Sequence, residues 1–543
     1  MSLSYCHGAS AIPLLGETIG ANLRRTVEQF GDREALVVRH QHFRATYREL
    51  WEQVSRAARG LLARGIRTGD RVGIWAPNRF EWVVLQFATA RLGAILVNIN
   101  PAYKSVEVEF ALKQSGVKLL ALARGFRNTD YLAILQEISG RCPQLEGHLV
   151  LDSDWEAFLH AGDAFSEKDL EAIEARLQFD DPINIQYTSG TTGTPKGATL
   201  SHHNILNNAY LATGRMRYTE RDRICVPVPF YHCFGMVFGN LGCMCRGAGN
   251  VVPGESFDAH AVLETVQAER CTSLYGVPTM FIAMLDEPRF AKYDLSSLRT
   301  GIMAGAPCPV EVMKLVQTRM NMREVTIVCG MTETSPGSTQ TSPDDPLEKR
   351  VETVGRPLDH VEIKIIDPAT GFIVPRGTPG EQCTRGYLVM LGYWNDPDAT
   401  SKAIDSAGWM HTGDLAVMDD DDYVRIVGRI KDVIIRGGEN IYPREVEEFL
   451  HTIPGVAEVQ VIGVPSSRYG EEVMAWVKLR EGTALSGDQL HEACRNRIAT
   501  YKIPRYWKFV QAFPMTVTGK VQKFRMREIA AAELSDNAVN HRG

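Results

Sequence analysis

A stretch rich in glycine and threonine, TSGTTGTPKG at residues 188–197, most constrains how this chain can fold. Before it, Ile183, Ile185 and Tyr187 alternate with polar residues as in a half-buried strand, and an extended pattern resumes after it. Glycines let backbone N–H groups approach an anion, hydroxyl groups add donors, and Lys196 adds a positive charge. The pattern predicts a loop between two strands that cradles a polyphosphate.

This loop is not a Walker A motif. Pro195 stands where the second glycine would precede the lysine, and neither Ser nor Thr follows Lys196. The alternative is a flexible linker of Ser, Thr and Gly. The flanking strand patterns and the embedded Pro-Lys pair favour the phosphate loop.

Helical and strand-like segments alternate over the first third of the chain. Residues 47–64 and 81–92 carry apolar side chains at helical spacing, whereas residues 71–75 and 94–99 are short and strand-like. This alternation predicts an α/β fold of parallel sheets covered by helices. After about residue 343, short strands separated by Gly, Pro and Asp turns predict a β-rich subdomain.

The last part of the chain predicts a small α+β unit. Its expected elements are a helix at 443–450, strands at 456–464 and 473–479, a helix at 486–499 and a strand at 507–510. We place the domain boundary at residues 429–432, which gives an N-terminal domain of residues 1–429 and a C-terminal domain of residues 430–543.

Composition excludes several classes of protein. The formal net charge is −6, which disfavours a nucleic-acid partner because such proteins need a basic surface. We expect no transmembrane segment because the apolar stretches are short, and no secretory signal because no Lys or Arg precedes the first one. The eleven cysteines include no CxxC pair, which is typical of reduced thiols in a cytoplasmic protein.

Three further motifs have ordinary explanations when each is considered alone. CGMTET at residues 329–334 could be a turn with a capping residue, and HTGD at 411–414 could be a glycine turn. TGK at 518–520 could end in an exposed lysine on a hairpin. The functional alternative for Asp414 is that it accepts hydrogen bonds from ribose hydroxyls, as acidic residues do in other nucleotide sites.

Taken in order, the motifs resemble those of the adenylate-forming superfamily, which includes acyl-CoA synthetases, firefly luciferase and peptide-synthetase adenylation domains. The matching set is TSGTTGTPKG, PFYHCFG, AGAP, GMTET, HTGD, GRIKDVIIRGGENIYPREVE and TGK, spread over residues 23–527. Within the superfamily the chain is most similar to the fatty-acid-activating branch, notably medium-chain acyl-CoA ligases. The resemblance implies an AMP-forming acid–thiol ligase that uses ATP, Mg²⁺ and CoA, with a small C-terminal domain that rotates.

The resemblance also implies which residues bind the nucleotide. The residues expected to hold the ATP phosphates are Thr188, Ser189, Gly190, Thr191, Thr192, Gly193, Thr194, Pro195 and Lys196. Those expected around the adenine are Gly305, Ala306 and Pro307, together with residues 327–331, which include Cys329, Gly330 and Met331. Asp414 would bind the ribose hydroxyls, with Arg429 beside it.

A second group of residues is implied in catalysis. Thr332 would contact the α-phosphate, and Glu333 would hold Mg²⁺, with Thr191 as a further candidate ligand. Lys520, on the moving domain, would reach the α-phosphate and the acid, and His232 completes the expected catalytic set. Lys431 matches the hinge, and the residues expected to replace Lys520 for the CoA step are Gly437, Gly438 and Glu439.

The expected acid substrate follows from positions at which this chain differs from other members of the superfamily. Amino-acid activators carry an Asp after the Phe of the PF segment, whereas residues 230–234 here contain no carboxylate. Acetate-specific relatives carry a Trp where this chain has Gly330, which would leave the pocket open. The expected acyl-pocket residues are Met236, Val277, Met303 and Gly330.

The leading hypothesis is therefore an ATP-dependent ligase for medium- to long-chain fatty acids. Chain length stays open because Met236 stands where some long-chain enzymes place a gating Trp. The alternatives are a CoA ligase for aromatic or branched acids, a luciferase-like oxidase and a non-catalytic nucleotide-binding protein. The expected partners are the fatty acid, ATP and CoA, and a homo-oligomer is a further candidate state.

Overall fold

The computed structural model describes residues 2–188, 195–306, 308–466, 468–495, 497–515 and 521–540, with side chains described to residue 534. The backbone divides into two compact units. The larger unit comprises Cys6–Ile363 and Thr384–His411, and the smaller unit comprises Met1–Tyr5, Lys364–Cys383 and Thr412–Gly543. The predicted domain boundary at residues 429–430 lies inside the smaller unit. It marks where the C-terminal domain is expected to rotate, and one structure does not test a rotation, so the boundary stays a prediction.

The larger unit contains a seven-stranded sheet in the order β21-β11-β10-β5-β4-β6-β9. Its strands are β4 (Arg71–Trp75), β5 (Ile95–Asn98), β6 (Val117–Leu122), β9 (Gly147–Val150), β10 (Pro182–Thr188), β11 (Lys196–Ser201) and β21 (Gly392–Tyr393). The five strands β10, β5, β4, β6 and β9 pair in parallel. Strand β11 pairs antiparallel with β10, and β21 pairs antiparallel with β11. The predicted parallel sheet is therefore confirmed, with an antiparallel edge that carries the motif lysine.

A nine-stranded sheet in the same unit has the order β18-β17-β16-β15-β14-β12-β13-β2-β3. Its strands are β2 (Glu34–Val38), β3 (Phe43–Thr46), β12 (Arg223–Cys225), β13 (Gly249–Val252), β14 (Ser273–Gly276), β15 (Thr300–Ala304), β16 (Glu324–Gly330), β17 (Gly337–Gln340) and β18 (Arg356–Pro357). The six strands from β16 to β2 are parallel. Parallel strands place all their carboxyl ends at one edge of the sheet, which is where ligands bind in such folds.

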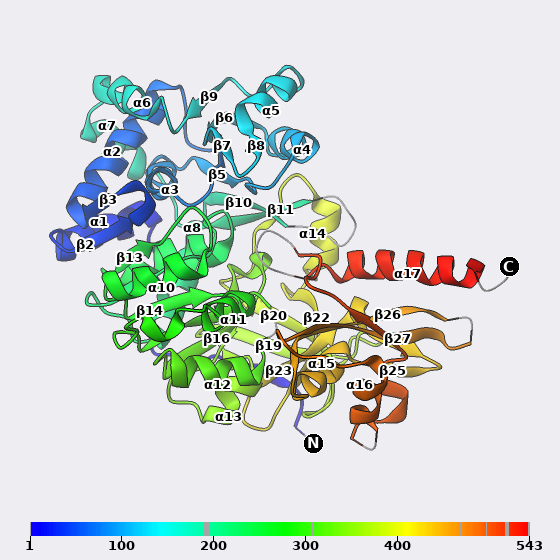
Figure 1. The fold of residues 1–543 in the computed structure, drawn as a ribbon. Coiled ribbons are helices and arrows are strands. Elements are labelled where there is room, and N and C mark those ends of the chain that lie inside the picture. The colour runs from blue at the N-terminus through cyan, green and yellow to red at the C-terminus, as the bar shows by residue number, and fades with distance from the viewer. Residues whose placement is uncertain are drawn as a thin grey trace. The chain divides into compact units, whose positions relative to one another are not determined.

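Helices cover these sheets, as α10, α11 and α12 do along the nine-stranded sheet (Figure 1). The helices of the larger unit are α1 (Ile19–Phe30), α2 (Tyr47–Ala63), α3 (Phe80–Leu92), α4 (Ser105–Ser115), α5 (Tyr131–Ile138), α6 (Trp155–Ala161), α7 (Glu167–Glu174), α8 (His202–Arg215), α9 (Gly242–Arg246), α10 (Ala259–Ala268), α11 (Pro278–Leu285), α12 (Val310–Arg319), α13 (Leu347–Glu352) and α14 (Pro397–Ala403). A short hairpin joins β7 (Gly125–Phe126) and β8 (Thr129–Asp130).

Two helices illustrate how the sequence specifies these elements. Helix α2 begins at a capping box, in which Thr46 and Glu49 satisfy each other's backbone N–H groups. Helix α3 has no exposed polar face, because all but the first of its residues are buried, including the polar Glu81 and Arg91. It packs against α1 and α2, because a helix with no polar face is stable only inside the fold.

The smaller unit contains the predicted α+β segment at the C-terminal end. Its sheet has the order β25-β24-β27-β26, with β28 beside β27. The strands are β24 (Ile434–Arg436), β25 (Glu439–Ile441), β26 (Val456–Ser466), β27 (Gly470–Leu479) and β28 (Tyr506–Phe509), and the helices are α15 (Pro443–His451), α16 (Gly487–Cys494) and α17 (Lys523–Asn540). Strands β1 (Tyr5–His7), β19 (Val361–Ile366), β20 (Gly380–Gly386) and β22 (Met410–Met418) run across the division between the units, and β23 (Val424–Arg429) pairs with β22.

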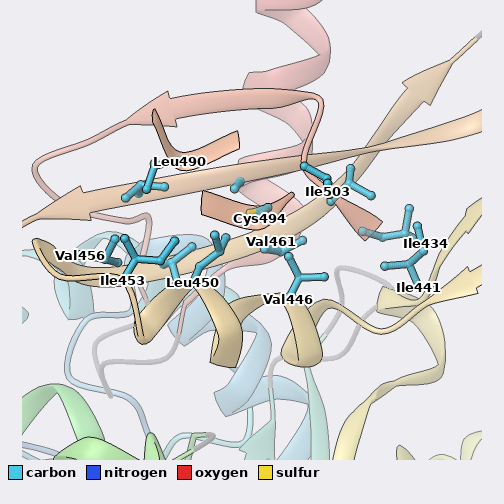
Figure 2. Packing of buried hydrophobic residues seen from close by; sticks show 14 residues of the cluster. Ile434, Ile441, Val446, Leu450, Ile453, Val456, Val461, Leu490, Cys494 and Ile503 are labelled. Atoms are coloured by element: carbon cyan, nitrogen blue, oxygen red, sulfur yellow. The ribbon is translucent and has the colours of Figure 1, made fainter. Parts of the chain in front are cut away.

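Two hydrophobic cores hold this segment together. Figure 2 shows the side chains of Val446 and Leu450 on α15 pointing toward the sheet, where Val461 is buried with them. In the second core, Trp476 and Met474 of β27 pack with Met526 of α17. Helices thus pack on buried residues of the sheet in two separate clusters. The C-terminal segment therefore has hydrophobic cores of its own.

The structure differs from the sequence-based expectation at the end of one helix. The helix expected over 486–499 ends at Cys494, because Arg495 leaves the helical conformation with ψ 136°. Residues Phe234–Leu241 form a π-helix, η4, for which the sequence analysis made no prediction. In the described part of the chain, no helix is apolar over a length that would cross a bilayer.

Candidate functional site

The predicted phosphate loop joins two paired strands. Thr188 ends β10 and faces Lys196, the first residue of β11, in the antiparallel register. The Thr188 hydroxyl lies 3.4 Å from the Lys196 carbonyl oxygen. The strand prediction on both sides is confirmed, while residues 189–194 lie outside the described residues. The base of the loop is thus fixed by β-sheet pairing, with Pro195 and Lys196 at its second side.

Glu333 lies next to the base of this loop. It belongs to the 3₁₀ turn η6 (Thr332–Thr334), and it is only 5% exposed. Its carboxylate Oε1 accepts a hydrogen bond from the Tyr393 hydroxyl at 2.8 Å and lies 3.4 Å from the Thr188 hydroxyl. Its backbone carbonyl accepts from the Met390 N–H at 2.9 Å.

The surroundings of Glu333 suit a divalent cation. Within the described residues, no Lys, Arg or His nitrogen lies within the 4.0 Å ion-pair distance of its carboxylate. A buried carboxylate without a basic partner is unfavourable unless a cation compensates its charge. Hard oxygen ligands such as carboxylates and hydroxyls are those that Mg²⁺ prefers. The donor set therefore fits the metal that the sequence predicts at Glu333.

Tyr393 is a site residue that the sequence analysis missed. It lies on β21, which pairs with β11 so that Tyr393 faces Ala198. The Lys196 ammonium lies 5.0 Å from the centre of its ring, within cation–π distance. The sequence Gly-Tyr-Trp at 392–394 carries no charge or spacing signal, so only the strand pairing identifies it.

The carboxyl ends of three parallel strands bring together residues expected around the adenine and the acid. The register pairs Gly276 with Met303 and Ala304 with Val328, so the residues that follow each strand are neighbours. Gly305 has a φ of +87°, and a Cβ there would lie 3.1 Å from the Val277 side chain. Ala306 follows, and its carbonyl accepts from the Cys308 thiol at 3.5 Å. Pro307 lies outside the described residues.

The PFYHCFG segment reaches the Glu333 turn through a sulfur contact. The Cys233 Sγ lies 3.8 Å from the hydroxyl of Thr332. His232 Nδ1 accepts from the Phe234 backbone N–H at 3.2 Å, which anchors the ring at the start of η4. Two motifs about a hundred residues apart in sequence are thus neighbours, whereas a catalytic role for His232 stays a prediction.

Met236 is held in place by side-chain amides. Its sulfur lies 3.5 Å from Asn98 Nδ2 and 3.7 Å from Gln186 Nε2, and its carbonyl accepts from Gln86 Nε2 at 3.3 Å. Met236, Val277 and Met303 are all buried. Their role in an acyl pocket stays a prediction, but the contacts indicate that Met236 is not a freely rotating side chain.

Gly330 has no space for a side chain. A Cβ at this position would lie 1.8 Å from the Pro336 carbonyl oxygen, because β16 and β17 pair closely there. A substitution at Gly330 would therefore disturb the backbone next to Glu333. We expected Gly330 to leave open space for the acid. The direction in which its side chain would point is filled by backbone, although the residue itself is exposed. Cys329 and Met331 flank it at the end of β16 and the start of η6.

In the smaller unit, Asp414 and Arg429 are a cross-strand pair on β22 and β23. Arg429 Nε donates to Asp414 Oδ1 at 2.8 Å, with 15% of the Asp414 side chain exposed and 53% of the Arg429 side chain. The Asp414 N–H donates to the Thr412 hydroxyl at 3.1 Å, and the hydroxyl donates to the Gln382 carbonyl. The predicted ribose-binding residues are thus neighbours in a fixed geometry.

The predicted hinge residue Lys431 lies in the 3₁₀ turn η7 (Ile430–Asp432). Partial burial of its ammonium group and the positive charge of Arg429 lower the pKa of Lys431. The backbone N–H of Val433 donates to the Arg429 carbonyl at 3.2 Å, so the turn is closed across Lys431.

The residues expected in the CoA step form the turn between β24 and β25. Gly437 and Gly438 have φ of +60° and +91°, a conformation that favours glycine, and Glu439 is exposed. The Gly437 N–H donates to the Tyr469 carbonyl at 2.8 Å. Lys520 lies outside the described residues, and the roles of all four stay predictions.

Comparisons with known proteins agree along nearly the whole chain. A family model described as AMP-binding enzyme matches residues 23–394, and one described as AMP-binding enzyme C-terminal domain matches residues 445–520. A putative acyl-CoA synthetase, YngI, of Bacillus subtilis is 48% identical over 95% of this chain and 97% of its own.

Two further proteins are similar over comparable lengths. The mitochondrial medium-chain acyl-CoA ligase ACSF2 of Danio rerio is 45% identical over 98% of this chain and 92% of its own. Among solved structures, the anthranilate CoA ligase AuaEII in complex with anthranoyl-AMP is 26% identical and matches with a TM-score of 0.87, over 96% of this chain and 99% of its own.

Proposed function

The chain belongs to the AMP-binding enzyme family, in its acyl-CoA ligase branch, and from this premise we propose that its acids are medium- to long-chain fatty acids. As an AMP-forming acid–thiol ligase it uses ATP and CoA. We propose that the reaction takes two steps, with an acyl-AMP intermediate. The name of the ACSF2 relative, a medium-chain acyl-CoA ligase, supports this choice of acid.

One observation carries the proposal. Glu333 and Lys196 meet around Tyr393 beside the phosphate loop, and the Cys233–Thr332 contact brings the PFYHCFG segment to the same turn. That segment contains no carboxylate to pair a substrate amine, and η4, which begins at its Phe234, is entirely buried. A site for these two substrates needs charged residues around ATP and apolar residues around the chain of the fatty acid, and the two groups of residues described here meet both needs.

In the first step, a carboxylate oxygen of the acid attacks the α-phosphorus of ATP. The bond from that phosphorus to the bridging oxygen breaks, and pyrophosphate leaves with the electron pair. Repulsion between two anions and the charge on the leaving group dominate the barrier, so catalysis is positioning and electrostatic stabilisation. Thr188 and Lys196 at the loop, Thr332 at the α-phosphate and Lys520 would supply these contacts.

Four further residues would support this step. Glu333, with Thr191 as a further candidate ligand, would hold Mg²⁺, which supplies positive charge against the phosphates when bound. Asp414 would accept from the ribose hydroxyls and fix the nucleoside, with Arg429 orienting its carboxylate.

In the second step, the CoA sulfur attacks the acyl carbonyl carbon. The bond from that carbon to the phosphate oxygen breaks, AMP leaves, and the thiol proton passes to solvent. We propose that residues 430–543 rotate about Lys431 between the two steps, so that the Gly437–Gly438 turn and Glu439 serve the CoA step. Such a movement protects the acyl-AMP from water before CoA arrives.

An acid panel tests this proposal. Pyrophosphate release and CoA thioester formation would be measured with ATP and Mg²⁺ for straight-chain acids of increasing length, for branched acids and for anthranilate. We expect the highest kcat/KM for straight acids of medium to long chain, with no pyrophosphate release when the acid is omitted. A preference for the aromatic or branched acids would refute the fatty-acid assignment and favour the other ligase alternative.

A further inference from the structure

Tyr393 contacts two separate site residues with two different parts of its side chain. Its hydroxyl donates to Glu333 Oε1 at 2.8 Å, and its ring faces the Lys196 ammonium at 5.0 Å from the ring centre. These are the carboxylate and the ammonium that the proposed adenylation step uses. One tyrosine therefore links the cation side of the site to the phosphate loop.

The backbone around Tyr393 is tied down on both sides. Its own N–H donates to the Thr400 hydroxyl at 2.9 Å, and the N–H of Trp394 donates to the Gly197 carbonyl at 2.7 Å. The N–H of Met390 donates to the Glu333 carbonyl, so the same segment holds both the main chain and the side chain of Glu333. The ring position is thus set by strand pairing rather than by the hydroxyl alone.

The phenol is a hydrogen-bond donor to a carboxylate. Burial, followed by the negative charge of Glu333, raises the pKa of Tyr393, so the proton stays on the phenol at neutral pH. The bond occupies Oε1, and in the described part of the chain no residue hydrogen-bonds Oε2. A carboxylate fixed through one oxygen presents the other in a defined direction, as metal-binding carboxylates do when an outer partner orients them.

We propose that Tyr393 is a positioning residue for adenylation. Its hydroxyl orients Glu333 so that Oε2 meets a divalent cation, and its ring holds Lys196 at the base of the phosphate loop. The inference rests on the proposed role of Glu333 in holding Mg²⁺. It adds a residue outside the motifs that carry the family resemblance, and it predicts separable effects for the two parts of one side chain.

Two substitutions separate these parts. Tyr393→Phe removes the hydroxyl and keeps the ring, so the Mg²⁺ concentration for half-maximal pyrophosphate release should rise about tenfold or more, as expected for losing a hydrogen bond to a charged group. The affinity for ATP measured by calorimetry without Mg²⁺ should change less than about threefold, because the hydroxyl acts on ATP only through the metal. Tyr393→Leu also removes the ring. Its kcat should be about two- to fivefold lower than that of Tyr393→Phe, which is the scale of an exposed cation–π contact.

Tyr131→Phe is the matched control. Tyr131 is buried, and its hydroxyl donates to the Pro101 carbonyl at 2.6 Å, away from Glu333 and Lys196. Its Mg²⁺ dependence should equal that of the wild type. If Tyr393→Phe also shows the wild-type Mg²⁺ dependence, or if Tyr131→Phe shifts it equally, the positioning role is wrong.

A second measurement reads binding without turnover. The affinity for ATP would be measured by calorimetry in the absence of acid, with saturating Mg²⁺ and without Mg²⁺. In Tyr393→Phe, and in Tyr393→Leu if Tyr393→Phe folds poorly, the gain in ATP affinity from Mg²⁺ should be about tenfold smaller than in the wild type, whereas Tyr131→Phe should keep the wild-type gain. An unchanged gain in the Tyr393 variants would overturn the proposal.

Failure of the proposed function would look different. These assays use the acid that the wild-type enzyme activates best in the panel, because Tyr393 acts on the nucleotide half of the reaction. If that acid is aromatic, the fatty-acid assignment fails while the effects at Tyr393 remain measurable. If the best acid is fatty and both Tyr393 variants behave as the wild type, only the positioning role fails.

Discussion

Removing the carboxylate charge of Asp414 tests the ribose contact. In Asp414→Asn the side chain keeps its size and one acceptor, while the ion pair to Arg429 and the charged acceptor are lost. A hydrogen bond to a charged group contributes about 1.5–3 kcal/mol, which corresponds to about 10- to 150-fold in affinity. We therefore expect the KM for ATP to rise by about 10-fold or more.

The ion pair itself should account for little of this effect. The Arg429 side chain is 53% exposed, and pairs of this kind contribute about 0.2–1 kcal/mol, or no more than about fivefold. Arg429→Gln breaks the same pair and leaves the carboxylate in place. Its KM for ATP should rise less than about fivefold, which makes it the matched control.

The assay is pyrophosphate release at saturating acid over a range of ATP concentrations, with thermal unfolding of each variant beside it. Both variants should melt close to the wild type, because a part-exposed pair contributes little to stability. If the two substitutions raise the KM for ATP by the same factor, Asp414 acts only through Arg429 and the ribose contact is wrong. An unchanged KM in Asp414→Asn would refute it as well.

Three further substitutions test the domain movement and the glycine beside the acid site. Lys520→Ala should lower adenylation by about 10²–10³ and retain thioester formation from supplied acyl-AMP, and equal loss in both half-reactions would reject two domain orientations. Lys431→Pro should give a burst of pyrophosphate with little thioester, because proline fixes φ and removes an N–H, whereas Lys431→Ala should keep both steps. Wild-type CoA turnover in Lys431→Pro would place the hinge elsewhere. Gly330→Ala should lower the melting temperature and slow adenylation of acids of every length, since its Cβ would lie 1.8 Å from the Pro336 carbonyl oxygen. Selective loss of the longer acids would instead restore the pocket interpretation.

Local patterns predicted much of the secondary structure. The apolar strand over 71–75 is β4, and the helix expected over 47–64 is α2, because a capping box and apolar spacing depend only on residues a few positions apart. The strands around the phosphate loop are likewise β10 and β11. Alternation of strands and helices also predicted the parallel sheets.

The order of the motifs along the chain was enough to predict the family and the class of reaction, because it can be read directly from the sequence. Their mutual distances did not follow from that order. Cys233 and Thr332, or Asp414 and Arg429, are brought together by strand ends and by strand register. The space around Gly330 is decided in the same way, by the close pairing of β16 and β17.

The sequence by itself determined most of the elements, the α/β class and the types of side chain in the motifs, because each depends on composition and spacing along the chain. Only the tertiary structure placed Tyr393 between Glu333 and Lys196. Its neighbours in the sequence carry no signal, and its two contacts arise where β21 pairs with β11 at the antiparallel edge of the sheet. Such a contact joins residues far apart in the chain, and only the packing of the sheet fixes which of them meet.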